Sequence, residues 1–575
     1  PDILCRAHLK YAGSDSTLDV PFADAAGMRA AFEALHRARF GFAETERTII
    51  VERLEATAAL GGNPLPTFAP PATGDGKPLT HARMWVAGGW CMVPFHQRAR
   101  LSCDTRINGP AVILEDHSTT VVEPGWQAHV DAQANIILER TTAPTALAAD
   151  TARDPILLEL FNHRFMAIAE QMGSVLAQTA HSVNIKERLD FSCAVFDRAG
   201  QLVANAPHMP VHLGSMGEAV QTLIAAHPDL APGDAYALND PYHGGTHLPD
   251  ITVVTPVFLD GDATPAFYVA ARGHHADVGG IAPGSMPAHS THIDEEGVRF
   301  KAFALIEKGR FRESALRAHL TAGRWPARNP DQNIADIKAQ LAANARGIDE
   351  LRRMTDAFGR AVVDAYMDHI QAAAEEAVRR AITALKNGAC RYGLDNGAEI
   401  CVALSVDHDA RSAVIDFTGT SGQGRHNFNA PLAITRAAVL YAFRCLVDAD
   451  IPLNAGCLAP IKLIVPAGSI LNPRPPAAVV AGNVETSQAV TNALFLAMGV
   501  AAASQGTMNN LSFGNDRYQY YETLGGGTGA GPGFAGASAV HSHMTNSRLT
   551  DAEVLEWRYP VLVENFAIRR NSGGA

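Results

Sequence analysis

Residues 250–273 read DITVVTPVFLDGDATPAFYVAARG, two runs of β-branched and aromatic residues on either side of the pair Asp260-Gly261. Runs of this kind, separated by a Gly-containing turn, predict an antiparallel β-hairpin. A second hairpin is predicted at FSCAVFDRAGQLVAN, residues 191–205, with Ala-Gly at its turn. No run of alternating β-α-β units occurs, so we expect an α+β fold in which helices and strands occupy separate segments.

Two helical patterns flank the hairpins. Asp154 followed by Pro155 is a favourable N-cap and first-turn pair, and the apolar residues after it are spaced for one face of a long helix. Residues 332–387 are rich in Ala and charged residues, with Glu375 and Arg379 four positions apart. They predict a helical hairpin or arm of structural or oligomeric use, and we expect a homo-oligomer.

The chain is expected to hold several domains, because 575 residues with 47% hydrophobic content exceed one ordinary core. Residues 1–142 alternate at period two and predict a β-rich piece. The small, polar residues 143–153 predict a linker, and residues 154–575 a large mixed α/β domain. The chain begins with Pro and ends in RRNSGGA, which indicates a fragment or a processed chain, truncated at its C-terminus.

The composition argues against several classes of partner. The formal net charge is -12, and no run of Lys and Arg interleaved with aromatic residues occurs, so we expect no nucleic acid. The eight cysteines are scattered without a CxxC pair, which predicts thiols in a reducing compartment. There is no run of about 18 apolar residues and no signal-peptide pattern, so we expect a cytoplasmic protein without a membrane partner.

The window from residue 239 to residue 280 is rich in imidazole and carboxylate groups, which are ligands of Mn, Fe and Zn. A hairpin turn at Asp260-Gly261 would place residue 247 opposite residue 274, and a longer loop centred on residue 262 would place residue 250 there. Either register brings two of these side chains to the open end of the hairpin beside the third.

We therefore predict that His247, Asp250 and His274 bind about one divalent metal ion. His275 should point to the opposite face of the strand, where it would be an alternative ligand or would support the others. The competing interpretation is that these are loop histidines hydrogen-bonded to the backbone.

Other polar residues are candidates for catalysis. The segment NIKERLDFS, residues 184–192, ordinarily predicts a solvated turn. His212 is expected in a loop shaped by Pro207 and Pro210, as a general base, a further ligand or an ordinary loop histidine. The candidate catalytic residues are Asp190, His212, Asp240 and Asp277.

The Gly-rich segment LGGGTGAGPG, residues 524–533, does not predict a nucleotide site, because no Lys follows its glycines and no helix pattern comes after them. The polar side chains of residues 481–492 and 505–515 are better suited to lining an amide-binding pocket. A G-x-S-x-G nucleophile elbow near a usable base is also missing, which disfavours covalent serine hydrolysis.

Several long motifs resemble the hydantoinase B/5-oxoprolinase family. They include NIKERLDFSCAVFDRAGQLVAN (184–205), NDPYHGGTHLPD (239–250), RGHHADVGG (272–280), AGNVETSQAVTNALF (481–495) and YYETLGGGTGAGPGF (520–534). Residues 1–142, with NGPAVILEDHSTTVVEPGW at 108–126, resemble the C-terminal end of a hydantoinase A-type subunit. The two halves are joined as in single-chain 5-oxoprolinases.

The resemblance implies ATP-dependent hydrolysis of a cyclic amide, with 5-oxoproline converted to glutamate as the leading expectation. An A-type region outside this chain, in cis or in trans, would bind ATP and Mg, and the B-type half would hydrolyse the activated ring. The resemblance also implies a metal at HLPD and the later HH pair. The alternatives are hydrolysis of an N-substituted hydantoin, ATP-dependent carboxylation of a ketone, and a non-catalytic scaffold for an ATPase subunit.

Overall fold

The computed structural model describes residues 2–12, 17–40, 43, 45, 47–59, 74–103, 105–142, 149–206, 209–448, 451 and 453–572. It contains two compact units. The first comprises Pro1–Cys5 and Ala56–Ala149, and the second comprises Arg6–Glu55 and Asp150–Ala575. Most of the expected linker, residues 143–148, lies outside the described residues.

The first unit consists of strands, as the period-two pattern of its sequence predicts. One sheet has the order β4 (Thr80–Val86), β5 (Gly89–Gln97), β7 (Ala111–Leu114) and β8 (Thr119–Val122). A smaller sheet has the order β10 (Ile136–Arg140), β9 (Trp126–Val130) and β6 (Arg106–Asn108), and the short 3-10 turn η1 covers Arg98–Arg100. Alternate side chains of these strands form a small apolar core.

Another three-stranded sheet lies near the N-terminus. Its central strand is β1 (Asp2–Tyr11), with β2 (Leu18–Pro21) on one side and β3 (Ile49–Ala59) on the other. Helix α1 (Ala25–Phe40) packs its apolar face on this sheet, because Phe32 and Phe40 share a buried cluster with Tyr11.

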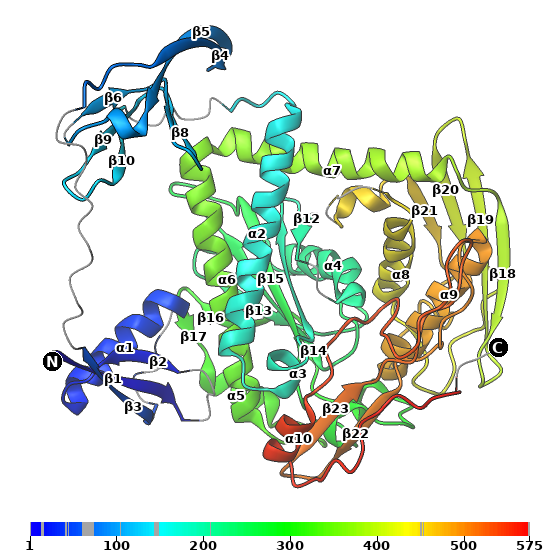
Figure 1. The fold of residues 1–575 in the computed structure, drawn as a ribbon. Coiled ribbons are helices and arrows are strands. Elements are labelled where there is room, and N and C mark those ends of the chain that lie inside the picture. The colour runs from blue at the N-terminus through cyan, green and yellow to red at the C-terminus, as the bar shows by residue number, and fades with distance from the viewer. Residues whose placement is uncertain are drawn as a thin grey trace. The chain divides into compact units, whose positions relative to one another are not determined.

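The large unit is centred on a seven-stranded antiparallel sheet, drawn mostly in green in Figure 1. Its order is β12 (Leu202–Asn205), β11 (Phe191–Phe196), β15 (Phe267–His274), β14 (Asp250–Val257), β13 (Ala235–Leu238), β16 (Phe303–Glu307) and β17 (Arg310–Phe311). Both predicted hairpins are present, as β11 with β12 and as β14 with β15. The two strands at the centre are buried along their whole length.

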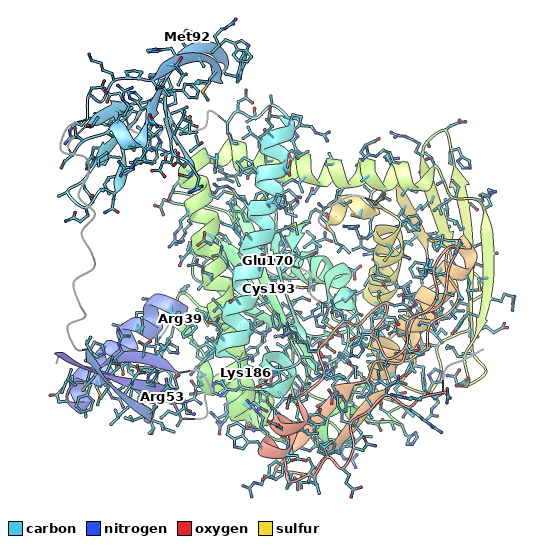
Figure 2. The ribbon with its side chains drawn as sticks, in the orientation of Figure 1. Arg39, Arg53, Met92, Glu170, Lys186 and Cys193 are labelled. Carbon is cyan, nitrogen blue, oxygen red and sulfur yellow. The ribbon has the colours of Figure 1, made fainter. Side chains whose placement is uncertain are left out.

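Helices cover both faces of this sheet. On one face α2 (Pro155–Thr179) packs against α6 (Pro330–Phe358), and Figure 1 shows them side by side across the strands. The Asp154 side chain caps α2 by accepting from the N–H groups of Ile156 and Leu157, as predicted. Cys193 of β11, labelled in Figure 2, is buried beneath α2. Its neighbours along the strand point to the other face, where α4 (Pro210–Ala226) lies.

The helical segment expected at 332–387 is present as two helices. Gly359, at φ 83°, ends α6, and α7 (Arg360–Ile382) follows directly. Arg379 donates to Glu375 at 2.8 Å, the predicted i, i+4 pair. Polar residues of α6, including Gln340 and Asn344, are buried against the central sheet.

A second core forms around a four-stranded sheet of order β18 (Gly388–Gly393), β19 (Glu399–Asp407), β20 (Ser412–Asp416) and β21 (Ile461–Ile464). Helices α8 (Leu432–Cys445) and α9 (Ser487–Met498) pack together, and α8 also packs on α4. The π turn η5 (Gly482–Thr486) leads into α9.

Near the C-terminus a hairpin of β22 (Asn510–Gly514) and β23 (Gln519–Thr523) precedes α10 (Ala552–Arg558). The remaining short elements are α3 (Val183–Lys186), η2 (Pro283–Ser285), η3 (Ile293–Glu295), α5 (Glu313–Leu320) and η4 (Ala455–Leu458). The mixed α+β, multidomain prediction is confirmed. Among the described residues, every helix is too short or too polar to cross a membrane.

Candidate functional site

Three of the predicted ligands meet at the open end of the β14–β15 hairpin. Asp250 is the first residue of β14 and pairs with His274, the last residue of β15, so the register is that of the longer loop. His247 lies in the turn before β14. Its Nε2 is 3.1 Å from Asp250 Oδ1, His274 Nδ1 is 3.1 Å from the same oxygen, and the two nitrogens are 3.2 Å apart.

These distances match the spacing between ligand atoms around one small divalent ion. Two ligands at about 2.1 Å from an ion and at right angles to each other lie about 3 Å apart. All three residues are buried, and the other ring nitrogens, His247 Nδ1 and His274 Nε2, have no hydrogen-bond partner among the described residues. We call His247, Asp250 and His274 the triad. It could hold one metal ion.

The pKa shifts of Asp250 and His274 favour the forms of these two groups that bind a cation. Burial lowers the pKa of the His274 imidazole, which favours the neutral ring. Burial would raise the pKa of the Asp250 carboxyl, but the His247 and His212 rings outweigh it and hold that pKa well below its usual range. An ionised carboxylate and a neutral imidazole are the ligand forms that metals require.

Two further side chains contact the second carboxylate oxygen of Asp250, Oδ2. Thr246 Oγ1 donates to Asp250 Oδ2 at 2.6 Å, and His212 Nε2 lies 3.3 Å from the same oxygen. His212 Nδ1 in turn lies 3.2 Å from Ser192 Oγ on β11. The expectation that His212 lies in a loop is wrong, because it belongs to the first turn of α4, where Pro210 is tolerated as the first helical residue.

The His274 ring is covered by an aromatic residue far along the chain. Tyr521 of β23 stacks on it with ring centroids 4.7 Å apart and planes at 18°. The Arg188 guanidinium lies 5.2 Å from the centroid of the Tyr521 ring, and its Nη1 donates to the Tyr521 carbonyl. The backbone of Asp190 also reaches this place, because its carbonyl accepts from the His274 N–H.

Comparison with known proteins identifies a family model that matches the part of the chain that contains the triad. Residues 154–575 match the model of a family described as hydantoinase B/oxoprolinase. This match covers well over half of the chain and contains the whole triad. The chain belongs to the hydantoinase B/oxoprolinase family.

Two relatives that resemble the chain over its whole length are named 5-oxoprolinases. The chain is 43% identical to 5-oxoprolinase 1 of Arabidopsis thaliana over 99% of its own length and 47% of that protein, and 41% identical to the 5-oxoprolinase of Dictyostelium discoideum over 100% and 46%. It therefore spans about half the length of the curated relatives it matches. Residues 1–142 lie outside the family model but inside these alignments.

The fold is also found in a solved structure. The ATP-dependent caprolactamase from Pseudomonas jessenii superposes with a TM-score of 0.65 at 23% identity, over 72% of this chain and 75% of that one. This likeness shows that the chain and the caprolactamase share the same fold over the aligned part.

Two of the predicted catalytic carboxylates lie in turns and loops rather than with the triad. Asp240 accepts from the Tyr242 N–H through Oδ1, and its Oδ2 lies 3.1 Å from His243 Nδ1. Asp277 accepts from the Gly279 and Arg328 N–H groups through Oδ1. Its Oδ2 accepts from the Gly284 N–H and from Arg328 Nη1. Burial raises the pKa of Asp277, against these hydrogen bonds.

His275 points away from the triad, to the face covered by α6. Its Nε2 lies 3.2 Å from Gln340 Oε1, and its Nδ1 lies 3.1 Å from Asn333 Nδ2. The change of face follows from strand alternation, as expected for the residue after His274. Gln340 also donates to the carbonyls of Ile251 and Ala271, so it ties α6 to the two central strands.

The interpretation of NIKERLDFS as a solvated turn is wrong for its second half. Arg188 and Asp190 are buried, with Arg188 Nη2 donating to the hydroxyls of Thr523 and Ser547. A local charge pattern cannot predict this, because the partners come from the C-terminal 60 residues. The roles of Ser192 and Tyr521 likewise depend on contacts between separate segments, whereas Thr246 contacts Asp250 within the same short segment and is close enough in the sequence to have been considered.

A pocket of about 750 Å³ lies on the far side of Tyr521. Its lining includes Glu485, Gln505, Thr507 and Asn510, from the two segments expected to line an amide pocket. The Tyr521 hydroxyl donates to Asn510 Oδ1 at 2.8 Å, and Asn510 Nδ2 donates to Glu485. Tyr521 therefore contacts the triad with its ring and the pocket lining with its hydroxyl.

Proposed function

We propose that this chain supplies the hydrolytic half of an ATP-dependent cyclic amide hydrolase, with 5-oxoproline as substrate and glutamate as product. The observation that carries the proposal is the triad, in which two imidazoles and a carboxylate direct three ligand atoms at one point. Relatives named 5-oxoprolinase align with the whole chain, and a relative of the same fold is named an ATP-dependent caprolactamase, which supports a ring amide as the substrate class.

His247, Asp250 and His274 would hold a divalent ion of the Mn, Fe or Zn type. When bound, such an ion activates water and polarises a carbonyl. Asp190 is the candidate general base, because its backbone carbonyl accepts from the His274 N–H and so places the residue beside the triad. In the reaction, the oxygen of a water molecule bonds to the carbonyl carbon, the ring C–N bond breaks, and the nitrogen gains the proton that the water loses.

The ATP-dependent step is assigned to an A-type region that is not part of these 575 residues. The sequence holds no Gly-x4-Gly-Lys-Ser/Thr motif that would cradle phosphates. ATP with Mg would phosphorylate the ring carbonyl oxygen there and leave as ADP, and the phosphorylated ring would pass to the triad. After the C–N bond breaks, a second water molecule would release the phosphoryl group as phosphate and leave the carboxylate of glutamate. A soluble small molecule is thus the proposed substrate, and the A-type region the proposed partner.

Metal analysis of the purified chain tests the proposal. We expect about one Mn, Fe or Zn per chain, and loss of that metal in the double variant His247→Ala, Asp250→Ala. His243→Ala is the matched control, because His243 lies in the same segment with its side chain exposed. Metal-free protein that supports full 5-oxoproline turnover with a complete A-type partner would contradict the role of the triad. Parallel assays with hydantoin, and with acetone plus bicarbonate, distinguish the alternative substrates.

A further inference from the structure

We propose that Ser192 is a positioning residue for the triad, which acts through His212 to orient Asp250. The inference rests on the proposed function, because it assigns Asp250 as a metal ligand. Ser192, His212 and Asp250 lie on β11, α4 and β14, and their side chains form one continuous line of close polar contacts, 3.2 Å from Ser192 Oγ to His212 Nδ1 and 3.3 Å from His212 Nε2 to Asp250 Oδ2.

The line is closed to solvent. Ser192 and Asp250 are 0% exposed and His212 is 1% exposed, so water does not compete for these groups. Ser192 is opposite Arg272 in the sheet, which puts it on the same face as Asp250 and His274, toward α4. Each hydrogen-bonding atom in this line must therefore find its partner within the protein.

The Asp250 carboxylate, at the end of the line, determines which atom donates in each contact. An ionised Asp250 can only accept, so His212 must carry its proton on Nε2. When the ring is neutral it has only this one proton, so Nδ1 is an acceptor and the Ser192 hydroxyl is the donor. Ser192 thus selects one of the two neutral forms of the ring, which is the role that outer partners commonly play at metal sites.

The two carboxylate oxygens of Asp250 therefore have different partners. Oδ2 accepts from Thr246 and from His212, while Oδ1 faces His247 and His274. Without the Ser192 hydroxyl, Nδ1 would be buried without a donor, and the ring would be free to carry its proton there. His212 would then stop donating to Oδ2, and the carboxylate could rotate away from the other two ligands.

A double-mutant cycle on the 575-residue chain tests this role. The measurement is the dissociation constant for Zn²⁺, by competition with a chromophoric chelator, together with the visible absorption of the Co²⁺-loaded protein. We expect Ser192→Ala to weaken Zn²⁺ binding about 10- to 100-fold and to change the Co²⁺ spectrum. Thr435→Ala is the matched control, because the Thr435 hydroxyl is equally buried and donates to the Leu471 carbonyl, away from the side chains that join Ser192 to Asp250. It should leave both readouts unchanged.

The second arm of the cycle uses His212→Gln. A Gln amide can donate to Asp250 Oδ2 without help, so Ser192→Ala should cause no further loss in that background. If Ser192→Ala weakened Zn²⁺ binding equally with His212 and with Gln at position 212, the positioning role of Ser192 through His212 would be overturned. A Ser192→Ala variant with wild-type Zn²⁺ affinity would overturn it as well. Failure of the wild-type chain to bind Zn²⁺ or Co²⁺ would instead overturn the proposed metal site itself.

Discussion

Asp277, a predicted catalytic residue, accepts four hydrogen bonds that hold the loop after β15 to Arg328. Asp277→Asn would leave the Arg328 charge without its counter-charge in a largely buried setting. We expect the free energy of unfolding to fall by about 3 kcal/mol, with metal content unchanged. Urea denaturation and metal analysis check this. Asp331→Asn, which breaks an exposed pair with Arg317, should cost less than about 1 kcal/mol. Intact stability with lost activity would instead favour a catalytic Asp277.

Glu296 makes stability depend on pH. Its carboxylate accepts from the Val479 and Val480 N–H groups, and burial raises its pKa to about 7, from 4.5 for an exposed Glu. Because the folded pKa is the higher one, this contribution to stability is full below pH 4.5 and is lost as pH rises through about 7. In the wild-type protein we expect the free energy of unfolding to fall by on the order of 3 kcal/mol between pH 5 and pH 8.5 because of Glu296. Glu296→Gln, whose Oε1 can still accept, should not show this fall. Urea titrations at both pH values measure it, and identical pH profiles would refute it.

At the scale of elements, the crossing of α4 and α8 depends on a glycine. A Cβ at Gly214 would lie 2.3 Å from Ala437 Cα, so α4 must move. We expect Gly214→Ala to cost about 1–3 kcal/mol of stability and to weaken metal binding, because His212 lies on the same helix. Urea denaturation and Zn²⁺ titration measure both effects.

Gly217 in the same helix is the matched control for this prediction. A Cβ there would have only one contact, at 3.9 Å, with the Gly200 carbonyl. Gly217→Ala should therefore stabilise the protein by up to about 1 kcal/mol, through helix propensity alone. If Gly214→Ala and Gly217→Ala changed the stability alike, the close approach of α4 and α8 would not be the reason that residue 214 requires a glycine.

At the scale of the whole molecule, the chain is expected to depend on a partner for catalysis. We expect the 575-residue chain alone to show no 5-oxoproline-stimulated ATP hydrolysis and no lactam opening, because phosphate transfer needs a cradle that its sequence lacks. Adding the A-type region in cis or in trans should start ATP-dependent turnover. Coupled ADP release and glutamate assays check this. Substrate-stimulated ATPase by the chain alone would show that the nucleotide site has been misplaced.

Local sequence was sufficient for much of the fold. The alternation and turn residues of 191–205 and 250–273 predicted both central hairpins, and Asp154-Pro155 predicted the start of α2, because these signals act over a few residues. The Ala-rich segments 333–358 and 365–386 likewise predicted two successive helices, and Gly359 ends the first of them.

For the site, the sequence by itself determined that His247, Asp250 and His274 meet, since a hairpin brings its two ends together in either register. Only the tertiary structure decided that residue 250 pairs with 274, because a long loop allows more than one register. It also decided that Ser192, His212 and Tyr521 surround the triad. The widest of those contacts joins Tyr521 to His274, two residues far apart in the sequence, through burial and packing, which leave no short-range pattern in the chain.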